Sequence, residues 1–450
     1  MLISGSYFIF SDTNSYIKGG QILFEYALRI VTTFIDGFGG ASAGAGADGG
    51  GSASVGPPAM TNDRGEPFVM RSFVYALYAY LAGGRLWPAG FAILQTAATI
   101  WTLFALIDAR ALHRPWVLTT GVVLIAAFST LPWFTVYLMP DILGATIIIY
   151  AAVLMVRFDD LSRTQITLLC LIATFAAASH YGHGPLAAAI LAVVVILRAL
   201  RRQLSRGFVL AAAIPVLFSP VANLTVSAVA LDRPEVTPLR LPILLARSLQ
   251  DGPAYWYLQD ACPDASYAFC EAFGDDLPRW IGDFLWDEDG IDSLTPDLLQ
   301  RIRDEEVAVI WAAFKAYPAQ QAWSFFGNSV KQVVQVGTGN ISPADREPSG
   351  HLARSDDETA LALLQSFDRI VMIMTWLATL IVFVLWITGR LTKRQRDTTL
   401  VLLAGVILNA LIFGGLSAPV DRYQSRIIWV FPALAVIFLA EGPKRRISAD

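Results

Sequence analysis

The segment Arg198-Ala-Leu-Arg-Arg-Gln-Leu-Ser-Arg206 joins two apolar stretches, 185–199 and 207–230, and it decides the fold. Lys and Arg recur in every second gap between the apolar stretches, whereas the alternate gaps at 139–141 and 179–185 contain neither. This alternation is the positive-inside rule, under which basic loops stay on the cytoplasmic side of a membrane. The other basic gaps contain Arg110 and Arg114; Arg157 and Arg163; Arg390, Lys393, Arg394 and Arg396; and Lys444, Arg445 and Arg446.

The apolar stretches predict an all-α polytopic membrane protein. A helix needs roughly 20 mostly apolar residues to cross a hydrocarbon core about 30 Å thick. Only 16% of the residues are charged, which is low for a soluble chain. Stretches 165–179 and 185–199 allow two spans or one broken region, and we predict two because the basic loops that flank them must share a side. The predicted spans are 87–108, 116–138, 141–156, 165–179, 185–199, 207–230, 369–388, 398–417 and 425–440.

Two polar segments divide the chain into four regions. Residues 1–86 are predicted to form the first extracytoplasmic loop, and residues 231–368 a small, mostly helical extracytoplasmic domain. Residues 87–230 contain transmembrane helices, and residues 369–450 contain the last of these helices and a cytoplasmic tail. The net charge of −4 comes with no basic patch of the kind that binds nucleic acid, so we expect a membrane but no nucleic-acid partner.

The first segment is expected to contain interfacial helices on either side of a flexible loop. Its apolar stub, residues 1–10, is too short to span a membrane, and we interpret it as the end of a helix that begins upstream or as a half-helix. Residues 39–59 are almost entirely Gly, Ala and Ser, which bury too little apolar surface to become ordered. The amphipathic stretches 17–34 and 66–82 are predicted to lie in the membrane interface.

The cysteines predict one disulfide. Cys262 and Cys270 lie in the second polar segment, on the side predicted to be extracytoplasmic, where disulfides persist. The alternative is two unpaired thiols. We expect no zinc site because no His lies nearby to complete one, and the sequence gives no support for a divalent metal or another cofactor. The many acidic residues of this segment are interpreted as solvated surface.

Arg422 and Arg426 are unusual among the polar residues predicted to lie on the outer side. The short outer loops contain no other Lys or Arg. An Arg at the start of a helix also opposes the helix dipole. Such a placement needs an anionic partner, which is either the neighbouring Asp421 or a phosphate group of a ligand.

His180 and His183 lie in another predicted outer turn, and three interpretations of them stay open. Their spacing suits a metal site, although no third ligand is evident. They also suit hydrogen bonds to a phosphate or a sugar. The third interpretation is a structural turn, which Gly182, Gly184 and Pro185 favour.

The order of these polar groups resembles the GT-C class of integral membrane glycosyltransferases, which includes protein mannosyltransferases and bacterial aminoarabinose transferases. In that class an Asp follows the first helix, and Ser11-Asp-Thr-Asn-Ser-Tyr16 is similar, although Thr13 stands where the mannosyltransferases carry Glu. An Arg-x-x-x-Tyr segment of the class resembles Arg71-Ser-Phe-Val-Tyr75. The second acidic residue of the class corresponds to Asp141, and its late Arg-Tyr pair to Arg422-Tyr423.

The resemblance implies a GT-C-like helical bundle that takes a sugar from a polyprenyl-phosphate donor. The acceptor, which is a lipid, a glycan or a protein, would be used on the extracytoplasmic face of a bacterial inner membrane. Asp12 is implied as the general base, with Asp141 as a second catalytic carboxylate. The implied substrate-binding residues are Arg71, Tyr75, His180, His183, Arg422 and Tyr423.

Three other classes also fit a polytopic chain. A transporter or flippase would need charged or broken helices near the middle of the membrane, and the predicted spans are nearly free of internal charge. An O-antigen ligase or polymerase shares the large outer loop, but the early acidic motif favours the GT-C class. The third alternative is a non-catalytic assembly factor.

Overall fold

A computed structural model of the protein describes residues 7–10, 12–39, 72–84, 87–231, 234–237, 240–262, 264–339, 341–346, 352–354 and 358–442. Within these residues, six helices are long and apolar enough to cross a membrane, and three shorter apolar helices accompany them. The chain is therefore an all-α polytopic membrane protein with one small sheet. The six are Asp141–Asp160 (α6 and η3), His183–Leu200 (α8), Arg206–Leu231 (α9), Ser366–Ile387 (in α16), Lys393–Gly415 (α17 and η5) and Asp421–Glu441 (α18 and α19); the shorter three are Pro88–Phe104 (α3), Pro115–Phe128 (α4) and Arg163–Ala178 (α7).

Each predicted span overlaps one of these helices, and the boundaries differ most at two of them. The predicted span 116–138 is too long, because α4 ends at Phe128 and the short helix α5 (Leu131–Thr135) follows. Ser129 has extended backbone there, and a proline follows within three residues, which cannot donate the hydrogen bond of a continuing helix. α16 (Glu358–Ile387) begins well before residue 369. The stretches 165–179 and 185–199 form two separate helices, α7 and α8.

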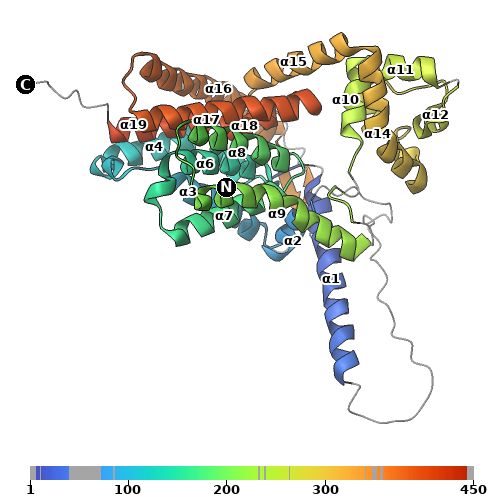
Figure 1. Ribbon diagram of the computed structural model, residues 1–450, viewed down its shortest axis with the longest axis horizontal. Helices are drawn as coiled ribbons and strands as arrows, with labels where there is room; N and C mark the ends of the chain where they lie inside the picture. Colours follow the sequence, from blue (N-terminus) through green and yellow to red (C-terminus); the bar gives the residue numbers. More distant parts are fainter. Residues whose placement is uncertain are drawn as a thin grey trace, which may run out of the picture.

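The helices α6 and α18–α19 form the buried centre of the bundle. In each of these spans, 89% of the residues in the most apolar stretch are buried inside the protein. α6 contacts α3, α7, α8 and α17 (Figure 1). Apolar composition alone does not decide this central position, because the span Ser366–Ile387 is more apolar and only 17% buried. The first residues of these central helices carry the charged side chains described below.

The basic gaps that the structure describes meet at one end of the bundle, called here the basic end. Three links join residues of two different gaps, and the fourth joins a gap to the last turn of α19, so the alternation read from the sequence corresponds to a shared location. The links are Arg394 to Asp108 (2.6 Å), Arg201 to Asp397 (2.6 Å), Arg198 to Asp159 (2.7 Å) and Arg114 to the carbonyl of Leu439 (3.1 Å). The opposite end is called the site end.

A smaller helical unit with its own core follows α9. Its buried side chains include Leu245, Leu258, Phe269, Phe284 and Ile302. α15 (Pro318–Val334) leads from this unit back to the bundle, where it contacts η5 (Figure 1). The other helices of the unit are α10 (Ile243–Asp251), α11 (Pro253–Ala261), α12 (Ala268–Phe273), α13 (Ile281–Leu285) and α14 (Pro296–Ala316).

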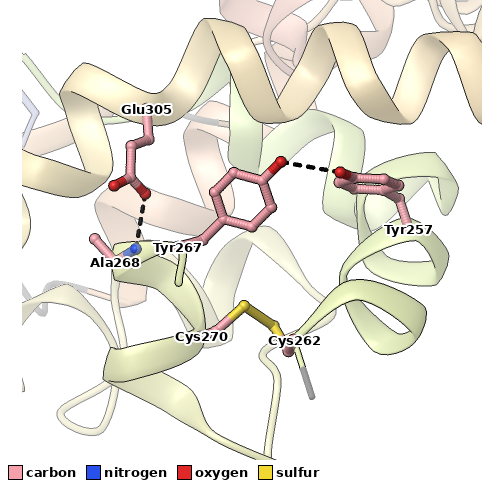
Figure 2. Close-up of a disulfide and its surroundings, with 6 residues drawn as sticks. All are labelled: Tyr257, Cys262, Tyr267, Ala268, Cys270 and Glu305. Atoms are coloured by element: carbon pink, nitrogen blue, oxygen red, sulfur yellow. Dashed lines mark hydrogen bonds between the residues drawn. A yellow bond between two sulfur atoms is a disulfide. The ribbon is translucent and has the colours of Figure 1, made fainter. Parts of the chain in front are cut away.

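Cys262 and Cys270 are joined by a disulfide, with their Cα atoms 5.1 Å apart (Figure 2). The bridge connects the end of α11 to α12. Two hydrogen bonds hold the same region: the hydroxyls of Tyr257 and Tyr267 lie 2.9 Å apart, and the Ala268 N–H donates to a carboxylate of α14 at 2.7 Å. Disulfide and hydrogen bonds together fix α11, α12 and α14 relative to one another.

The expectation that the apolar stub is part of a helix is wrong for the residues that the structure describes. Tyr7–Ile9 form strand β1, which pairs antiparallel with β2 (Ser342–Arg346), and β2 pairs antiparallel with β3 (Leu352–Arg354). Aromatic and β-branched residues favour strands. The other edge of β1 bonds to the bundle, because the Phe8 N–H donates to the Val136 carbonyl at 3.1 Å and the Phe8 carbonyl accepts from Leu138 at 2.9 Å.

Two helices of the first polar segment lie at the site end. α1 (Asp12–Gly39) packs against α2 (Phe73–Leu81) and runs across the direction of α16 and α19 (Figure 1). Its outer part exposes Leu28, Val31 and Ile35. A helix that lies in a membrane interface has this orientation and this exposed apolar side. The Gly-rich stretch predicted to be flexible, and the first half of the predicted helix 66–82, lie outside the described residues.

Candidate functional site

Three charged side chains meet inside the bundle where α6 and α18 (Asp421–Ile428) begin. α18 carries Arg422 and Arg426 four residues apart, so their side chains lie on the same side of the helix. Arg426 Nη1 lies 3.3 Å from Asp141 Oδ1, and Arg422 Nε lies 3.9 Å from the same oxygen. The exposed fractions are 3% for Asp141, 4% for Arg422 and 1% for Arg426. Two buried positive charges therefore share one carboxylate.

Within the part of the chain that the structure describes, Arg422 uses little of its hydrogen-bonding capacity. Its Nη1 donates to the hydroxyl of Tyr137 at 3.3 Å, while the contact with Asp141 is too long for a hydrogen bond. Among the described residues, the Arg422 guanidinium therefore makes one hydrogen bond, although it has five N–H donors. The guanidinium carbon lies 3.9 Å from the ring centre of Phe10 and 5.2 Å from that of Tyr423. Aromatic faces thus hold the cation in place while leaving donors available.

Arg426 is held from three directions. Its Nη2 donates to Asn409 Oδ1 at 2.9 Å, and its guanidinium carbon lies 3.9 Å from the ring centre of Phe413. Asn409 is itself fixed, because its Nδ2 donates to the Tyr423 carbonyl at 2.8 Å. Phe413 lies in η5 (Ala410–Gly415), a π-helical segment at the end of α17. Segments of this kind are frequent at functional sites.

Gly144 allows α6 to approach the side chains of Arg426 and His183. A Cβ atom at Gly144 would lie 3.2 Å from His183 Nε2 and 3.4 Å from Arg426 Nε. His183 is fully buried, and its Nδ1 lies 3.0 Å from the Ala176 carbonyl. Because a carbonyl only accepts, Nδ1 carries a proton, and in the neutral form of the ring Nε2 then presents a lone pair. Within the described part of the chain, His183 Nε2 and Arg426 Nε have no hydrogen-bond partner.

His180 lies in the turn between α7 and α8. Its Nδ1 accepts a hydrogen bond from the Gly182 N–H at 3.0 Å, so one ring nitrogen is used within the turn itself. The ring centre lies 5.1 Å from that of His183 and 5.7 Å from that of Phe413. Both predicted histidines therefore border the ring on which Arg426 stacks, and the turn accounts for only part of their arrangement.

Asp12 is the first residue of α1 and is half-buried at the site end. Its neighbours on either side fix its position: Phe10 stacks on Arg422, and Thr13 Oγ1 donates to the Leu138 carbonyl at 3.3 Å. Burial raises the pKa of the Tyr137 phenol above its usual value; Arg422 opposes this rise, whereas the carboxylates of Asp141 and Asp12 add to it. Asp12 is thus close enough to Tyr137 to contribute to the rise of its pKa.

Tyr75 is fully buried in α2 beside the same group of residues. Its hydroxyl donates to Gln95 Oε1 at 2.8 Å, and Gln95 Nε2 donates to the Tyr137 carbonyl at 2.9 Å. Burial raises the pKa of Tyr75 well above its usual value. The structure thus brings the described residues of the predicted site to one end of the bundle. Arg71, which was predicted to contribute a second cation, lies outside the described residues.

Asp421 does not supply the carboxylate that Arg422 contacts, although the sequence allowed that pairing. Arg422 lies beside Asp141, and the Asp421 side chain is directed toward Gly337. A Cβ atom at Gly337 would lie 2.9 Å from Asp421 Oδ2 and 3.0 Å from Asp368 Oδ2, so the two carboxylates are neighbours. Asp368 Oδ1 accepts hydrogen bonds from Thr338 at 2.8 and 3.1 Å.

Several residues of this group were not in the predicted site. Asn409 carried a weak signal, since it is a polar residue in an otherwise apolar span. Phe10, Tyr137, Phe413 and Gly144 carried none, because their importance depends on contacts with residues far away in the chain. Within the described residues, no group of three or more His, Cys, Asp or Glu side chains is placed to hold a metal ion.

Comparisons with protein-family models, with curated proteins and with solved structures find no match for this chain. The chemistry of the site therefore has to be argued from its own geometry. That geometry offers a buried pair of guanidinium groups that share one carboxylate, a second carboxylate on α1 and a buried imidazole. Such a set can bind an anion and can accept a proton nearby.

Proposed function

We propose that the protein is a GT-C-type membrane glycosyltransferase that transfers a sugar from a polyprenyl-phosphate donor to an acceptor. The observation that carries the proposal is that Arg422 and Arg426 are buried cations that share the carboxylate of Asp141. Buried charge is costly in a membrane protein, and it is usually associated with a partner or a ligand. A phosphate group would supply negative charge beside two groups whose planar N–H donors suit it.

The proposed reaction uses the carboxylates and cations in separate roles. An acceptor hydroxyl attacks the anomeric carbon of the sugar, and Asp12 takes its proton. The new bond joins the anomeric carbon to the acceptor oxygen. The bond from that carbon to the phosphate oxygen breaks, and its electron pair leaves with the polyprenyl phosphate. Arg422 stabilises the departing phosphate, while Asp141 and Asn409 position Arg426 beside it.

The position of the charges supports an extracytoplasmic site in a bacterial inner membrane. The linked Arg residues of the basic end would lie in the cytoplasm under the positive-inside rule. The site end would then face the extracytoplasmic side, together with the smaller helical unit and its disulfide. An oxidising compartment agrees with a disulfide at that position.

The test is transfer of radiolabelled sugar from polyprenyl phosphate in membranes that contain the wild-type protein or a variant. Asp12→Asn keeps the shape of the side chain but removes the base, so turnover should fall by about 10²- to 10⁴-fold while donor binding is kept. The matched control is Asp160→Asn at the basic end, where a 58% exposed carboxylate pairs with Arg157. Wild-type turnover in Asp12→Asn would remove Asp12 from the mechanism. Solute movement across liposomes without any sugar transfer would favour a transporter.

A further inference from the structure

A separate apolar groove lies between the smaller helical unit and the end of the bundle. It is a cavity of about 480 Å³, which is within the roughly 300–1,000 Å³ usual for ligand pockets. α10, α14, α15 and the residues that end η5 form its walls. Most of the side chains that line it are aliphatic or aromatic; they include Leu244, Val307, Ile310, Trp311, Phe314 and Phe325.

The polar side chains of the wall are paired within the protein, and of their buried atoms only Arg247 Nε makes no hydrogen bond among the described residues. Ser248 Oγ donates to Gln321 Oε1 at 2.8 Å across the groove, from α10 to α15. The guanidinium of Arg247 pairs with Asp251 within α10. With these groups engaged, the groove presents mainly hydrocarbon to an occupant. An apolar chain suits such a wall better than a sugar or a peptide backbone, whose polar groups would lose their hydrogen bonds to water.

The position of the groove relative to the membrane narrows the choice of occupant. Gly415 and Leu416 line it, and Gly415 is the last residue of the span Lys393–Gly415. The groove therefore begins where a membrane-spanning helix leaves the hydrocarbon layer. Leu416 is 44% exposed at this point, so the apolar surface of the span continues into the groove.

α15 extends this apolar surface along its length. Trp323, Phe326, Val330 and Val334 recur at helical spacing and are 60–78% exposed. Phe326 belongs both to this stripe and to the groove. A helix with one apolar face and an exposed Trp is typical of the membrane interface. Because α15 runs from the smaller helical unit to the bundle (Figure 1), the stripe leads from the groove toward the bundle.

We propose that this groove binds the hydrocarbon chain of a bilayer lipid at the level where α15 passes through the membrane interface. Lipid reaches the groove sideways from the outer part of the bilayer, along the surface that Leu416 and Phe326 share. Binding of this kind fixes the smaller helical unit against the membrane. The inference does not depend on the proposed sugar transfer, because it rests on a different group of residues.

The experiment uses the full chain in vesicles of phosphatidylethanolamine and phosphatidylglycerol that contain a phosphatidylcholine with a diazirine at the end of one acyl chain. After irradiation and digestion, mass spectrometry locates the labelled peptides. Label is expected on the groove faces of α14 and α15 in addition to the spanning helices. Ala322→Trp places an indole in the groove and should reduce the label on α14 several-fold.

The matched control is Ala319→Trp, which adds the same side chain at an exposed position of α15 outside the groove. It should keep the wild-type labelling, and the disulfide-containing unit should remain folded in both variants by circular dichroism. Label confined to the spanning helices, or equal label on α14 in Ala322→Trp and wild type, would overturn the proposal. Cross-links from the groove to a second copy of the chain would replace the lipid by a protein occupant and overturn it as well.

Discussion

Asp141 and Arg426 are 285 residues apart in the sequence, yet Oδ1 of one lies 3.3 Å from Nη1 of the other inside the bundle. The contact joins the first residue of α6 to α18, the two central spans. Arg422 approaches the same carboxylate at 3.9 Å. This single carboxylate is therefore a structural requirement for two cations as well as part of the candidate site.

We expect Asp141→Ala to destabilise the protein by about 3–5 kcal/mol, because removal of one partner leaves buried charge uncompensated. The measurement is the free energy of unfolding in detergent. Asp160→Ala is the control, since its carboxylate is 58% exposed and its pair with Arg157 should contribute no more than about 1 kcal/mol. Equal losses in the two variants would show that burial of the Asp141 contact has no special effect.

Variants of Arg422 should show whether donor binding needs the planar guanidinium or only a positive charge. Arg422→Ala should weaken donor binding and lower transfer, because a phosphate loses a charge-assisted partner. Arg422→Lys should recover only part of the loss, since an ammonium cannot reproduce the planar donor arrangement. Transfer measured over a range of donor concentrations checks this. The control is Arg110→Ala at the exposed basic end, which should leave the dependence of transfer on donor concentration unchanged. Wild-type transfer in Arg422→Lys would contradict a contact that needs the planar guanidinium.

The disulfide should stabilise the smaller helical unit. The closed loop spans eight residues, for which chain entropy predicts a contribution of about 2–3 kcal/mol. Hydrogen exchange of α11 and α12 should become faster in a Cys262→Ser and Cys270→Ser double variant, and exchange in α6 should not change. The wild-type protein under reducing conditions should show the same pattern. Unchanged exchange in α11 and α12 would mean that the local hydrogen bonds alone hold these helices.

The orientation of the protein in the membrane can be measured with single cysteines. Cys170 is buried and the other two cysteines are bridged, so the native chain should react little with a membrane-impermeant maleimide. Asp275→Cys, exposed in the smaller helical unit, should be labelled in intact cells. Arg202→Cys, exposed at the basic end, should react only after the membrane is opened. The reverse pattern would place the candidate site in the cytoplasm.

The helices were the predictable part of this fold. Span length and charge placement are local properties, so the sequence indicated α6, α7, α8 and α9 and the shared location of the basic gaps. The end of α4 was predicted too late, because an apolar stretch continued past the turn at Ser129. Hydropathy records burial in lipid or protein alike, and it contains no information on where a helix stops within an apolar stretch.

The candidate site was predictable only in part. Arg422 was evident because positive charge is rare in the outer loops, but its contact with Asp141 joins distant segments and could not be read from spacing. The stacking of Phe10 on Arg422 depends on strand β1, in a stub that had been expected to be helical. The closeness of Gly144 to His183 depends on how two helices cross, which one sequence does not specify.

The pairing of β1 with β2 sets an order for folding. Phe8 pairs with Pro343, so the strand near the start of the chain cannot complete its ladder until most of the protein has been synthesised. Contacts between such distant segments form slowly, because a long loop must close before they give any stabilisation. Phe10, just after β1, stacks on Arg422. The bundle can therefore insert helix by helix while the candidate site is assembled last, and a chain stopped before β2 would be a membrane protein without a finished site.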